Sequence, residues 1–280
     1  MNFFLKQKRI LKNNIFFYKS YLRAKKFITF LLDFLFIKKI KKGNNYNWIF
    51  PFLENNLENE FNIIEVGSRD GLDSITLSNK LNPNKLFVFE PNHTGISSSI
   101  YNISRYKGNV EIIFLPFAIN NIREKVNLTE FREYIYGNHH GSSSLFELNT
   151  KFLPENDIDK GLEERKRVEK IYKVPCCSLD YLDFLFEKFV FLIAMDVEGS
   201  ELNVLKGSEK LLKQTKYVCL ETGFNQPRKG LPRDEANRIV EFMSKINFSL
   251  LAVEKNGNSL PIDNGETKQF NILFKNNLIK

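Results

Sequence analysis

From residue 61 onward, short apolar runs alternate with stretches of helical character, and this alternation restricts the fold more than any other feature of the sequence. Strands and helices that follow one another in this rhythm are typical of βαβ units in a parallel sheet. The predicted parallel strands are residues 61–66, 86–89, 110–115, 190–195 and 217–220. The predicted helices are residues 73–80, 94–104, 178–187, 200–213 and 233–245. The sequence therefore predicts an α/β fold.

Two further apolar runs follow the last predicted helix, at residues 248–253 and 270–274. The turn-forming sequence Asn-Gly-Asn at residues 256–258 lies between them, which favours an antiparallel hairpin at the edge of the sheet. With the five parallel strands, this hairpin predicts a seven-stranded mixed sheet with helices on both faces. Residues 120–177 do not follow the rhythm, so we interpret them as an insertion in a main domain of residues 49–280.

The positive charge of the chain is concentrated at the amino terminus. The formal net charge is +8, but residues 1–42 hold 12 of the 41 lysines and arginines and only one acid, Asp33. The remainder carries 29 bases against 32 acids, and this slightly acidic body argues against a nucleic-acid partner. The apolar run at 27–37 is shorter than the roughly 20 residues that span a bilayer. We predict that residues 1–48 form a basic amphipathic helical extension, which either contacts an anionic membrane surface peripherally through residues 1–42 or packs on the main domain.

Cysteine and histidine are too scarce for a disulfide framework or a histidine-rich metal site. The chain has three of each, and Cys176 and Cys177 are adjacent. A chain of this kind fits a reducing compartment, so we expect a cytoplasmic protein, peripheral to the membrane if the extension binds lipid. Asp196 and Glu221 offer oxygen ligands of the kind that magnesium prefers, but two ligands are few, and we expect no bound metal.

The most informative local motif is E-V-G-S-R-D-G at residues 65–71, between a predicted strand and a predicted helix. Glycines let the backbone approach a ligand, and a helix amino terminus offers free N–H groups to an anion. The motif lacks the G-x-G-x-x-G spacing that binds a dinucleotide pyrophosphate, which disfavours NAD. It suits S-adenosylmethionine, whose tail carries an ammonium for Glu65 or Asp70 and a carboxylate for the backbone amides. The residues expected to contact this cofactor are Glu65, Gly67, Ser68, Asp70 and Gly71.

The ends of the next two predicted strands supply the rest of the cofactor site. Glu90, followed by Pro91 and Asn92, comes at the end of the second strand, where a carboxylate accepts hydrogen bonds from both ribose hydroxyls of an adenosyl ligand. The end of the third strand, at 116–119, is placed to line the adenine through Ala118. We therefore expect Glu90, Asn92 and Ala118 to bind the cofactor.

The fourth predicted strand ends in M-D-V-E-G-S-E at residues 195–201, an unusual density of acids after a buried run. Acids are costly to bury without a partner, so a cluster here indicates a site. Asp196 and Glu198 are two residues apart and, in an extended segment, point into the same crevice. Glu201 falls in the first turn of the next helix, where it favours the helix dipole.

This set of motifs resembles the FkbM methyltransferase family. The resemblance covers about residues 60–275 and rests on the segments at 65–71, 89–92, 178–180, 195–201 and 205–207, of which D-V-E-G-S-E followed by L-K-G is the most specific. It implies a Rossmann-like class I methyltransferase fold, S-adenosylmethionine as the methyl donor, and hydroxyl groups of carbohydrates or secondary metabolites as acceptors. The first loop of the family usually reads D-V-G-A-N-x-G, from which this chain departs at Glu65, Ser68 and Arg69.

The predicted function is therefore an S-adenosylmethionine-dependent O-methyltransferase that acts on a hydroxyl of a sugar, a glycan or a secondary metabolite. Methyl transfer requires alignment of the two reactants and a general base for the acceptor proton. The candidate bases are Asp196, Glu198 and His140, with His139 as the neighbouring histidine. We expect the insertion to form the acceptor pocket or its lid. Two alternatives stay open: a nucleic-acid methyltransferase anchored by the basic amino terminus, and a non-catalytic binding module with the same fold.

Overall fold

The structure is a computed structural model of the chain, and it describes residues 45–133, 137–138, 143–147, 167–187, 189–226 and 228–279. Two predictions fall outside these residues: the basic helix within 1–42, and the placement of His139 and His140. No helix among the described residues is long and apolar enough to cross a membrane.

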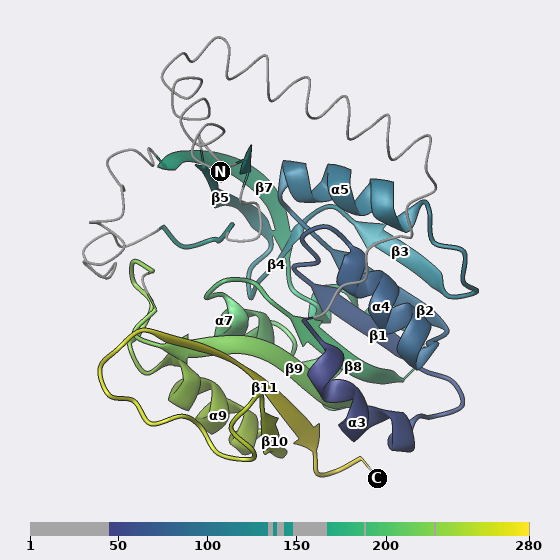
Figure 1. Cartoon of the computed structure of the whole chain (residues 1–280). Coiled ribbons are helices and arrows are strands. Elements are labelled where there is room, and N and C mark those ends of the chain that lie inside the picture. Colours follow the sequence, from purple (N-terminus) through teal and green to yellow (C-terminus); the bar gives the residue numbers. More distant parts are fainter. Residues whose placement is uncertain are drawn as a thin grey trace, which may run out of the picture. The chain divides into compact units, whose positions relative to one another are not determined.

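The main sheet has seven strands in the order β10-β11-β9-β8-β1-β2-β3 (Figure 1). They span β1 Asn62–Val66, β2 Lys85–Phe89, β3 Glu111–Leu115, β8 Val190–Met195, β9 Thr215–Phe224, β10 Phe248–Val253 and β11 Lys268–Asn276. The strands β9, β8, β1, β2 and β3 are parallel to one another, whereas β11 is antiparallel to both β9 and β10. The predicted mixed sheet and its terminal hairpin are thus confirmed.

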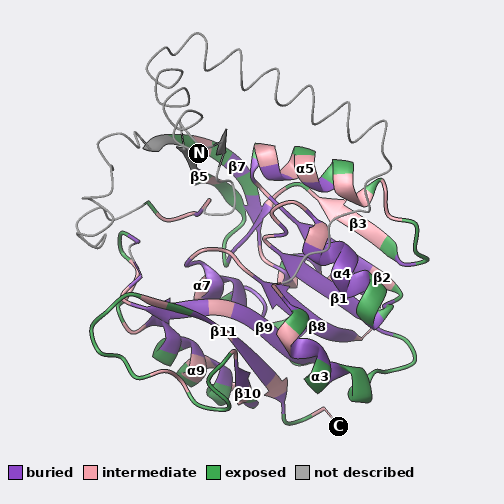
Figure 2. Cartoon of the chain, viewed as in Figure 1, coloured by how far each residue is buried: buried purple, intermediate pink, exposed green. Residues whose placement is uncertain are grey.

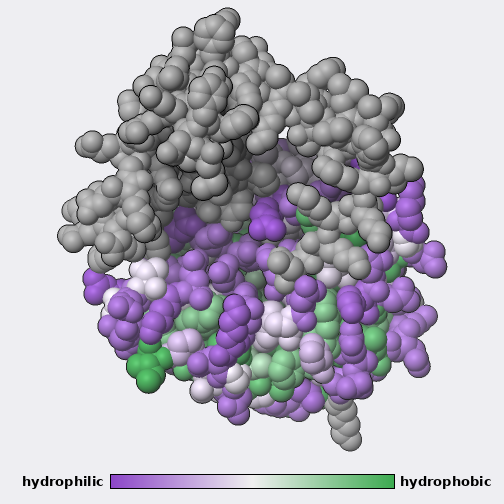
Figure 3. All heavy atoms as spheres, in the orientation of Figure 1, coloured by the Kyte–Doolittle hydropathy of each residue, from purple (hydrophilic) through white to green (hydrophobic). Residues whose placement is uncertain are grey.

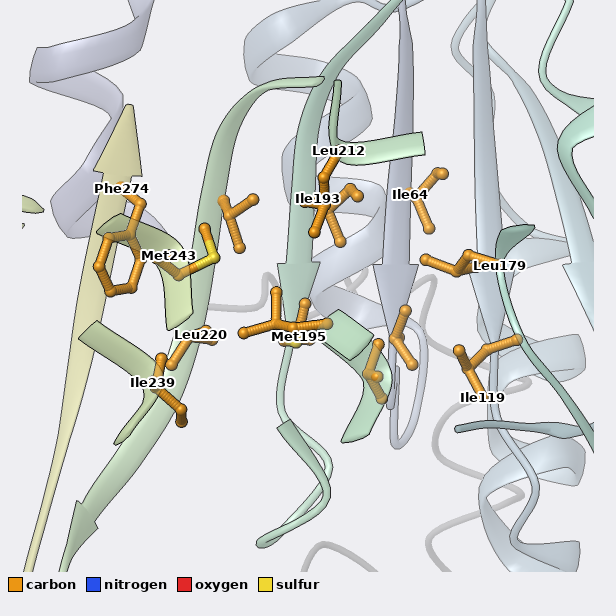
Figure 4. Close-up of a cluster of buried hydrophobic side chains, with 14 of the residues drawn as sticks. Ile64, Ile119, Leu179, Ile193, Met195, Leu212, Leu220, Ile239, Met243 and Phe274 are labelled. Carbon is orange, nitrogen blue, oxygen red and sulfur yellow. The ribbon is translucent and has the colours of Figure 1, made fainter. Parts of the chain in front are cut away.

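Apolar side chains pack on both faces of this sheet. Ile64 of β1 belongs to one layer and its neighbour Ile63 to the other, because successive residues of a strand point to opposite faces. Figure 4 shows part of the first layer, in which Leu220 of β9 and Phe274 of β11 lie near Ile239 and Met243 of α9 (Glu235–Lys245), while Ile64 of β1 lies near Leu179. The second layer contains Leu77 of α4 (Leu72–Leu81). Helices therefore cover both faces, and the central strands are almost wholly buried (Figure 2).

Two predicted helices differ from those in the structure. The one predicted at 200–213 is divided into α7 (Glu201–Lys206) and α8 (Glu209–Leu212). The helical bond from the Leu211 amide to the Gly207 carbonyl is replaced, because the carbonyl accepts from the Asp180 amide and the Leu211 amide donates to the Asp180 carboxylate. The one predicted at 178–187 is a short 3-10 helix, η5 (Asp180–Leu185). The Asp180 carboxylate accepts hydrogen bonds from the Lys210 and Leu211 amides of α8. The Asp180 amide donates to the Gly207 carbonyl at 3.0 Å, so the S-L-D and L-K-G segments are joined directly.

The packed body extends to Tyr46, slightly before the predicted domain boundary. The short elements η1 (Asn47–Ile49), α3 (Phe50–Leu53) and η2 (Glu54–Asn56) precede β1. Tyr46, Ile49, Phe50 and Leu53 are buried in the second apolar layer. On the face shown in Figure 3, the described surface is mostly hydrophilic, with smaller groups of hydrophobic residues between.

The insertion forms a second sheet in the order β4-β7-β5-β6, where the sequence predicted no strands. Its strands are β4 Ala118–Ile119, β5 Glu124–Glu133, β6 Gly137–Asn138 and β7 Arg167–Cys177. The antiparallel pair β5 and β7 encloses a small apolar cluster of Ala118, Leu128, Val174 and Cys176. On β7, Tyr172 stacks on His93 at the start of α5 (His93–Ile103), with 4.3 Å between ring centroids. The small sheet is thereby attached beside the carboxyl end of β2.

Candidate active site

A pocket lies at the carboxyl ends of the parallel strands β1, β2 and β8, where α/β proteins bind their ligands. It has about 570 Å³ of space between its walls, part of it open to solvent. The main sheet provides strand ends and loops, and the insertion provides one wall. The lining residues are Val66, Gly67, Arg69, Phe89, Glu90, Pro91, Phe117, Ala118, Ile119, Leu128, Ser143, Ser144, Leu145, Asp196, Val197, Glu198 and Ser200.

Gly67 joins the first and fourth strand ends. Its φ of 86° is in the left-handed region that favours glycine, and a Cβ there would lie 2.0 Å from the Asp196 carbonyl oxygen. Its amide donates to the Phe89 carbonyl at 2.8 Å, so the ends of β1, β2 and β8 meet at this residue. The absence of a side chain lets this loop pack directly against the backbone at the end of β8, and Gly67 itself lines the pocket.

Glu90 faces the pocket from the end of β2 and is held by two backbone amides. Its carboxylate accepts from the amides of Arg69 and Asn92, each at 2.7 Å. Burial raises the pKa of Glu90 to about 7, although both hydrogen bonds oppose the shift. A carboxylate has about four acceptor positions, so each oxygen keeps capacity for a ligand hydroxyl.

Three acids lie close together at the pocket, of which Asp196 and Glu198 line it. Asp196 shares a hydrogen bond with Glu221 of β9, and ligand oxygens of Asp196, Glu198 and Glu221 all lie within 4.8 Å of one another. Burial raises the pKa of Asp196 well above its usual value, and the negative charge of Glu221 adds to this shift. Burial, and then the negative charge of Glu198, raises the pKa of Glu221. Two carboxyls so close together favour a form in which one of them is protonated and donates to the other.

Glu198 takes part in a buried ion pair with Arg228, with 2.6 Å between Oε2 and Nη2. The two side chains are 16% and 6% exposed, so the guanidinium neutralises Glu198 within the protein. The three acids are oxygen ligands suited to a divalent cation, which would have to displace the shared proton and compete with Arg228. The expectation that no metal binds stays a prediction.

The comparison with protein families shows to which family the chain belongs. Residues 34–250 match the methyltransferase FkbM domain. The chain belongs to the FkbM methyltransferase family. It is an S-adenosylmethionine-dependent methyltransferase, as the motifs at the strand ends predicted. A search of curated proteins found no match.

Solved structures similar to this FkbM methyltransferase share little sequence with it. An rRNA methylase from Streptococcus thermophilus has 11% identity and a TM-score of 0.43, covering 84% of this chain and 97% of its own. TrmK from M. capricolum, in complex with S-adenosylhomocysteine, has 7% identity and a TM-score of 0.39, covering 81% and 67%. A precorrin-6y C5,15-methyltransferase from Geobacter metallireducens has 12% identity and a TM-score of 0.40, covering 85% and 92%.

The predicted site residues of the methyltransferase fall into two groups. The pocket is lined by Gly67, Glu90, Ala118, Asp196 and Glu198. The others support the loops behind it: Glu65, Ser68, Asp70, Gly71 and Asn92. Asn92 caps α5 by accepting from the amides of Thr94 and Gly95, and Asp70 accepts from the amide of Leu72.

Glu65, one of the two predicted partners of the cofactor ammonium, is turned away from the pocket. Only 1% of it is exposed, and it accepts a hydrogen bond from the Ser74 hydroxyl. Burial, and then the nearby Asp73, raises the pKa of Glu65 to about 8. The carboxyl is therefore mostly uncharged at neutral pH and serves as a buried link between β1 and α4.

Glu201 closes the loop that carries the acids, in addition to lying in the first turn of α7. Its carboxylate accepts from the amides of Val197 and Gly199, the latter at 3.0 Å. Burial raises the pKa of Glu201 to about 8. These contacts fix Asp196 and Glu198 between the end of β8 and the start of α7.

Residues 143–147 of the insertion form a strap across the pocket. The Ser143 hydroxyl accepts from the Asn92 side-chain amide at 2.6 Å, and the Ser144 hydroxyl donates to the Glu198 carbonyl at 2.7 Å. The strap therefore connects the end of β2 to the loop after β8. Sequence reasoning missed these serines and Arg228; the run of three serines was the signal for the strap, and Arg228 had none.

Proposed function

We propose that this methyltransferase transfers the methyl group of S-adenosylmethionine to a hydroxyl oxygen of a sugar, a glycan or a secondary metabolite. The observation that carries the proposal is the position of Asp196, which lines the pocket together with the glycine loop and residues of the insertion and is paired with the Glu221 carboxyl. A hydroxyl must lose its proton as it is methylated, and burial and the neighbouring Glu221 raise the pKa of the Asp196 carboxyl, which makes it a stronger base than an exposed aspartate.

The residues of the pocket fit the cofactor. Gly67 lines the pocket and, having no side chain, lets its loop pack against the end of β8, and Glu90 keeps acceptor capacity for ribose hydroxyls. We assign Gly67 and Glu90 to the cofactor, with Ala118 beside the adenine. When bound, S-adenosylmethionine supplies a methyl group on a positively charged sulfur.

We assign the role of general base to Asp196. Its Oδ1 is buried and has no hydrogen-bond partner among the described residues, and its carboxyl interacts with that of Glu221. In our proposal Oδ1 takes the proton of the acceptor hydroxyl, and Glu221 orients the carboxyl. Arg228 holds Glu198 in an ion pair, which leaves Glu198 less available as a base. His140, the third candidate, lies outside the described residues.

The acceptor class is tested by a screen with a methyl-labelled donor. The full chain is incubated with activated sugars, glycans, small hydroxyl metabolites and RNA oligonucleotides, and the labelled product is identified by mass spectrometry. We expect label on a sugar or metabolite oxygen. Label on RNA would instead support the nucleic-acid alternative, and binding of the cofactor without transfer to any acceptor would support a non-catalytic module. The proposed contact of residues 1–42 with anionic membrane stays a prediction.

Cofactor affinity is expected to increase with pH across the titration of Glu90. The carboxyl is protonated below its pKa of about 7 and charged above it, and only the charged form offers all its oxygens as acceptors to ribose hydroxyls. Calorimetry at about pH 6, 7 and 8 should show tighter binding at the higher pH. Glu90→Gln should weaken binding by about 10-fold or more and remove the pH dependence.

The matched control is Glu111→Gln, at the exposed start of β3. It should leave both the affinity and its pH profile as in the parent. An affinity that is equally strong in Glu90→Gln would exclude Glu90 from the cofactor site.

A further inference from the structure

Arg69 has a backbone conformation that is unusual for a residue with a side chain. Its φ is 57°, in the left-handed region where a Cβ crowds the backbone. The conformation is fixed from both sides, because the Arg69 amide donates to Glu90 and Gly71 adopts a φ of 73° two residues later. Strain of this kind persists where the surrounding structure enforces it, and functional sites are frequent examples.

The guanidinium of Arg69 has no hydrogen-bond or ion-pair partner among the described residues. Arg69 lines the pocket and is partly buried. Its charge is close enough to Glu90 to lower the pKa of that carboxyl, which places the guanidinium near the pocket. A partly desolvated guanidinium without a partner is costly unless a ligand supplies an anion.

Arg69 is the only cationic side chain among the described residues that line the pocket. The ionisable residues around it are the acids Glu90, Asp196 and Glu198, and the nearby Arg228 is paired with Glu198. An anionic group that enters this pocket therefore has one complementary side chain. The cofactor brings one such group, the carboxylate of its methionine portion.

We propose that the Arg69 guanidinium binds the carboxylate of the methionine portion of S-adenosylmethionine. Arginine suits this role because its planar fork donates two parallel hydrogen bonds to a carboxylate. The inference rests on the assignment of the cofactor to Gly67 and Glu90. It gives the loop at 65–71 a side-chain contact to the anion, in addition to the backbone amides.

The test compares three ligands by calorimetry with the full chain: S-adenosylmethionine, its decarboxylated form, and 5′-methylthioadenosine, which lacks the amino-acid portion. Arg69→Gln removes the charge and keeps most of the length. It should lose roughly 10- to 100-fold in affinity for S-adenosylmethionine, the effect of a charged hydrogen bond, and little for the other two ligands. Arg69→Asn, which tolerates a positive φ better, should show the same selectivity. Arg69→Lys should fall between parent and Arg69→Gln.

Arg123→Gln is the control for the loss of one positive charge, because Arg123 is exposed and stacks on Tyr181 outside the pocket. It should bind all three ligands as the parent does. An equal loss for S-adenosylmethionine and its decarboxylated form would overturn the proposal, because Arg69 would then act on the adenosyl portion. Unchanged affinity for all ligands would also overturn it. If the parent bound neither S-adenosylmethionine nor 5′-methylthioadenosine, the assignment of the whole cofactor site would instead be contradicted.

Discussion

Asp196→Asn is expected to lower the turnover number by about 10²- to 10⁴-fold, the range that general-base catalysis contributes. The amide fills the same volume and can donate to Glu221 in place of the shared proton, so the fold should be retained. It cannot accept the proton of an acceptor hydroxyl. The measurement is kcat for the acceptor found in the labelled-methyl screen, together with thermal unfolding and calorimetric cofactor affinity.

Asp183→Asn serves as the control, because Asp183 lies on the surface and pairs with Lys210. Its turnover should equal that of the parent. Full activity of Asp196→Asn would remove Asp196 from the reaction, and loss of the folded state would show that the residue is structural. Reduced turnover with a cofactor affinity close to that of the parent would show that Asp196 acts in the reaction and not in cofactor binding.

Gly67→Ala is expected to lower the free energy of unfolding by roughly 2–5 kcal/mol and to abolish cofactor binding. The left-handed conformation costs a residue with a Cβ about 1–2 kcal/mol. The remainder comes from the collision with the Asp196 carbonyl oxygen, 2.0 Å from the added carbon, which forces a backbone shift. Urea unfolding measures the first effect and calorimetry the second.

The chain offers a matched control in Gly257, which has a φ of 67° and no atom within 4 Å of an added Cβ. Gly257→Ala incurs the conformational cost alone and should keep cofactor binding. The difference between the two variants isolates the contact between the first and fourth strand ends. Equal destabilisation by both substitutions would show that the close contact between Gly67 and the Asp196 carbonyl adds nothing to the conformational cost.

The main sheet was predictable because its signal is local. The run Val190–Met195 is continuous and apolar, as expected for a strand buried on both faces. Asn62–Val66 contains the apolar residues Ile63, Ile64 and Val66 and is buried along its whole length. The second sheet was missed although Val126 and Leu128 alternate with polar residues on β5. The strands β5 and β7 pair with each other although a long segment separates them in the sequence. A long-range pairing of that kind cannot be recognised from the sequence of either strand alone.

The candidate site was predictable as far as it consists of strand ends. Parallel strands bring their carboxyl ends to one edge, so Gly67, Glu90 and Asp196 could be placed together from their positions in the sequence. The orientation of Glu65 toward Ser74, away from the pocket, depends on how α4 packs. The pairing of Glu198 with Arg228 depends on a loop beyond β9. Side-chain direction and long-range partners of this kind come from tertiary structure.

The order of the strands has a consequence for synthesis on the ribosome. β1 lies between β2 and β8, and Val66 pairs with both Phe89 and Met195. A nascent chain that has emerged only as far as the insertion can pair β1 with β2, but the other edge of β1 stays open until the residues of β8 appear. An open apolar strand edge is a template for aggregation. Newly made chains should therefore expose this edge until residue 195 has left the ribosome, and the residues of the small sheet leave the ribosome before the centre of the main sheet can close.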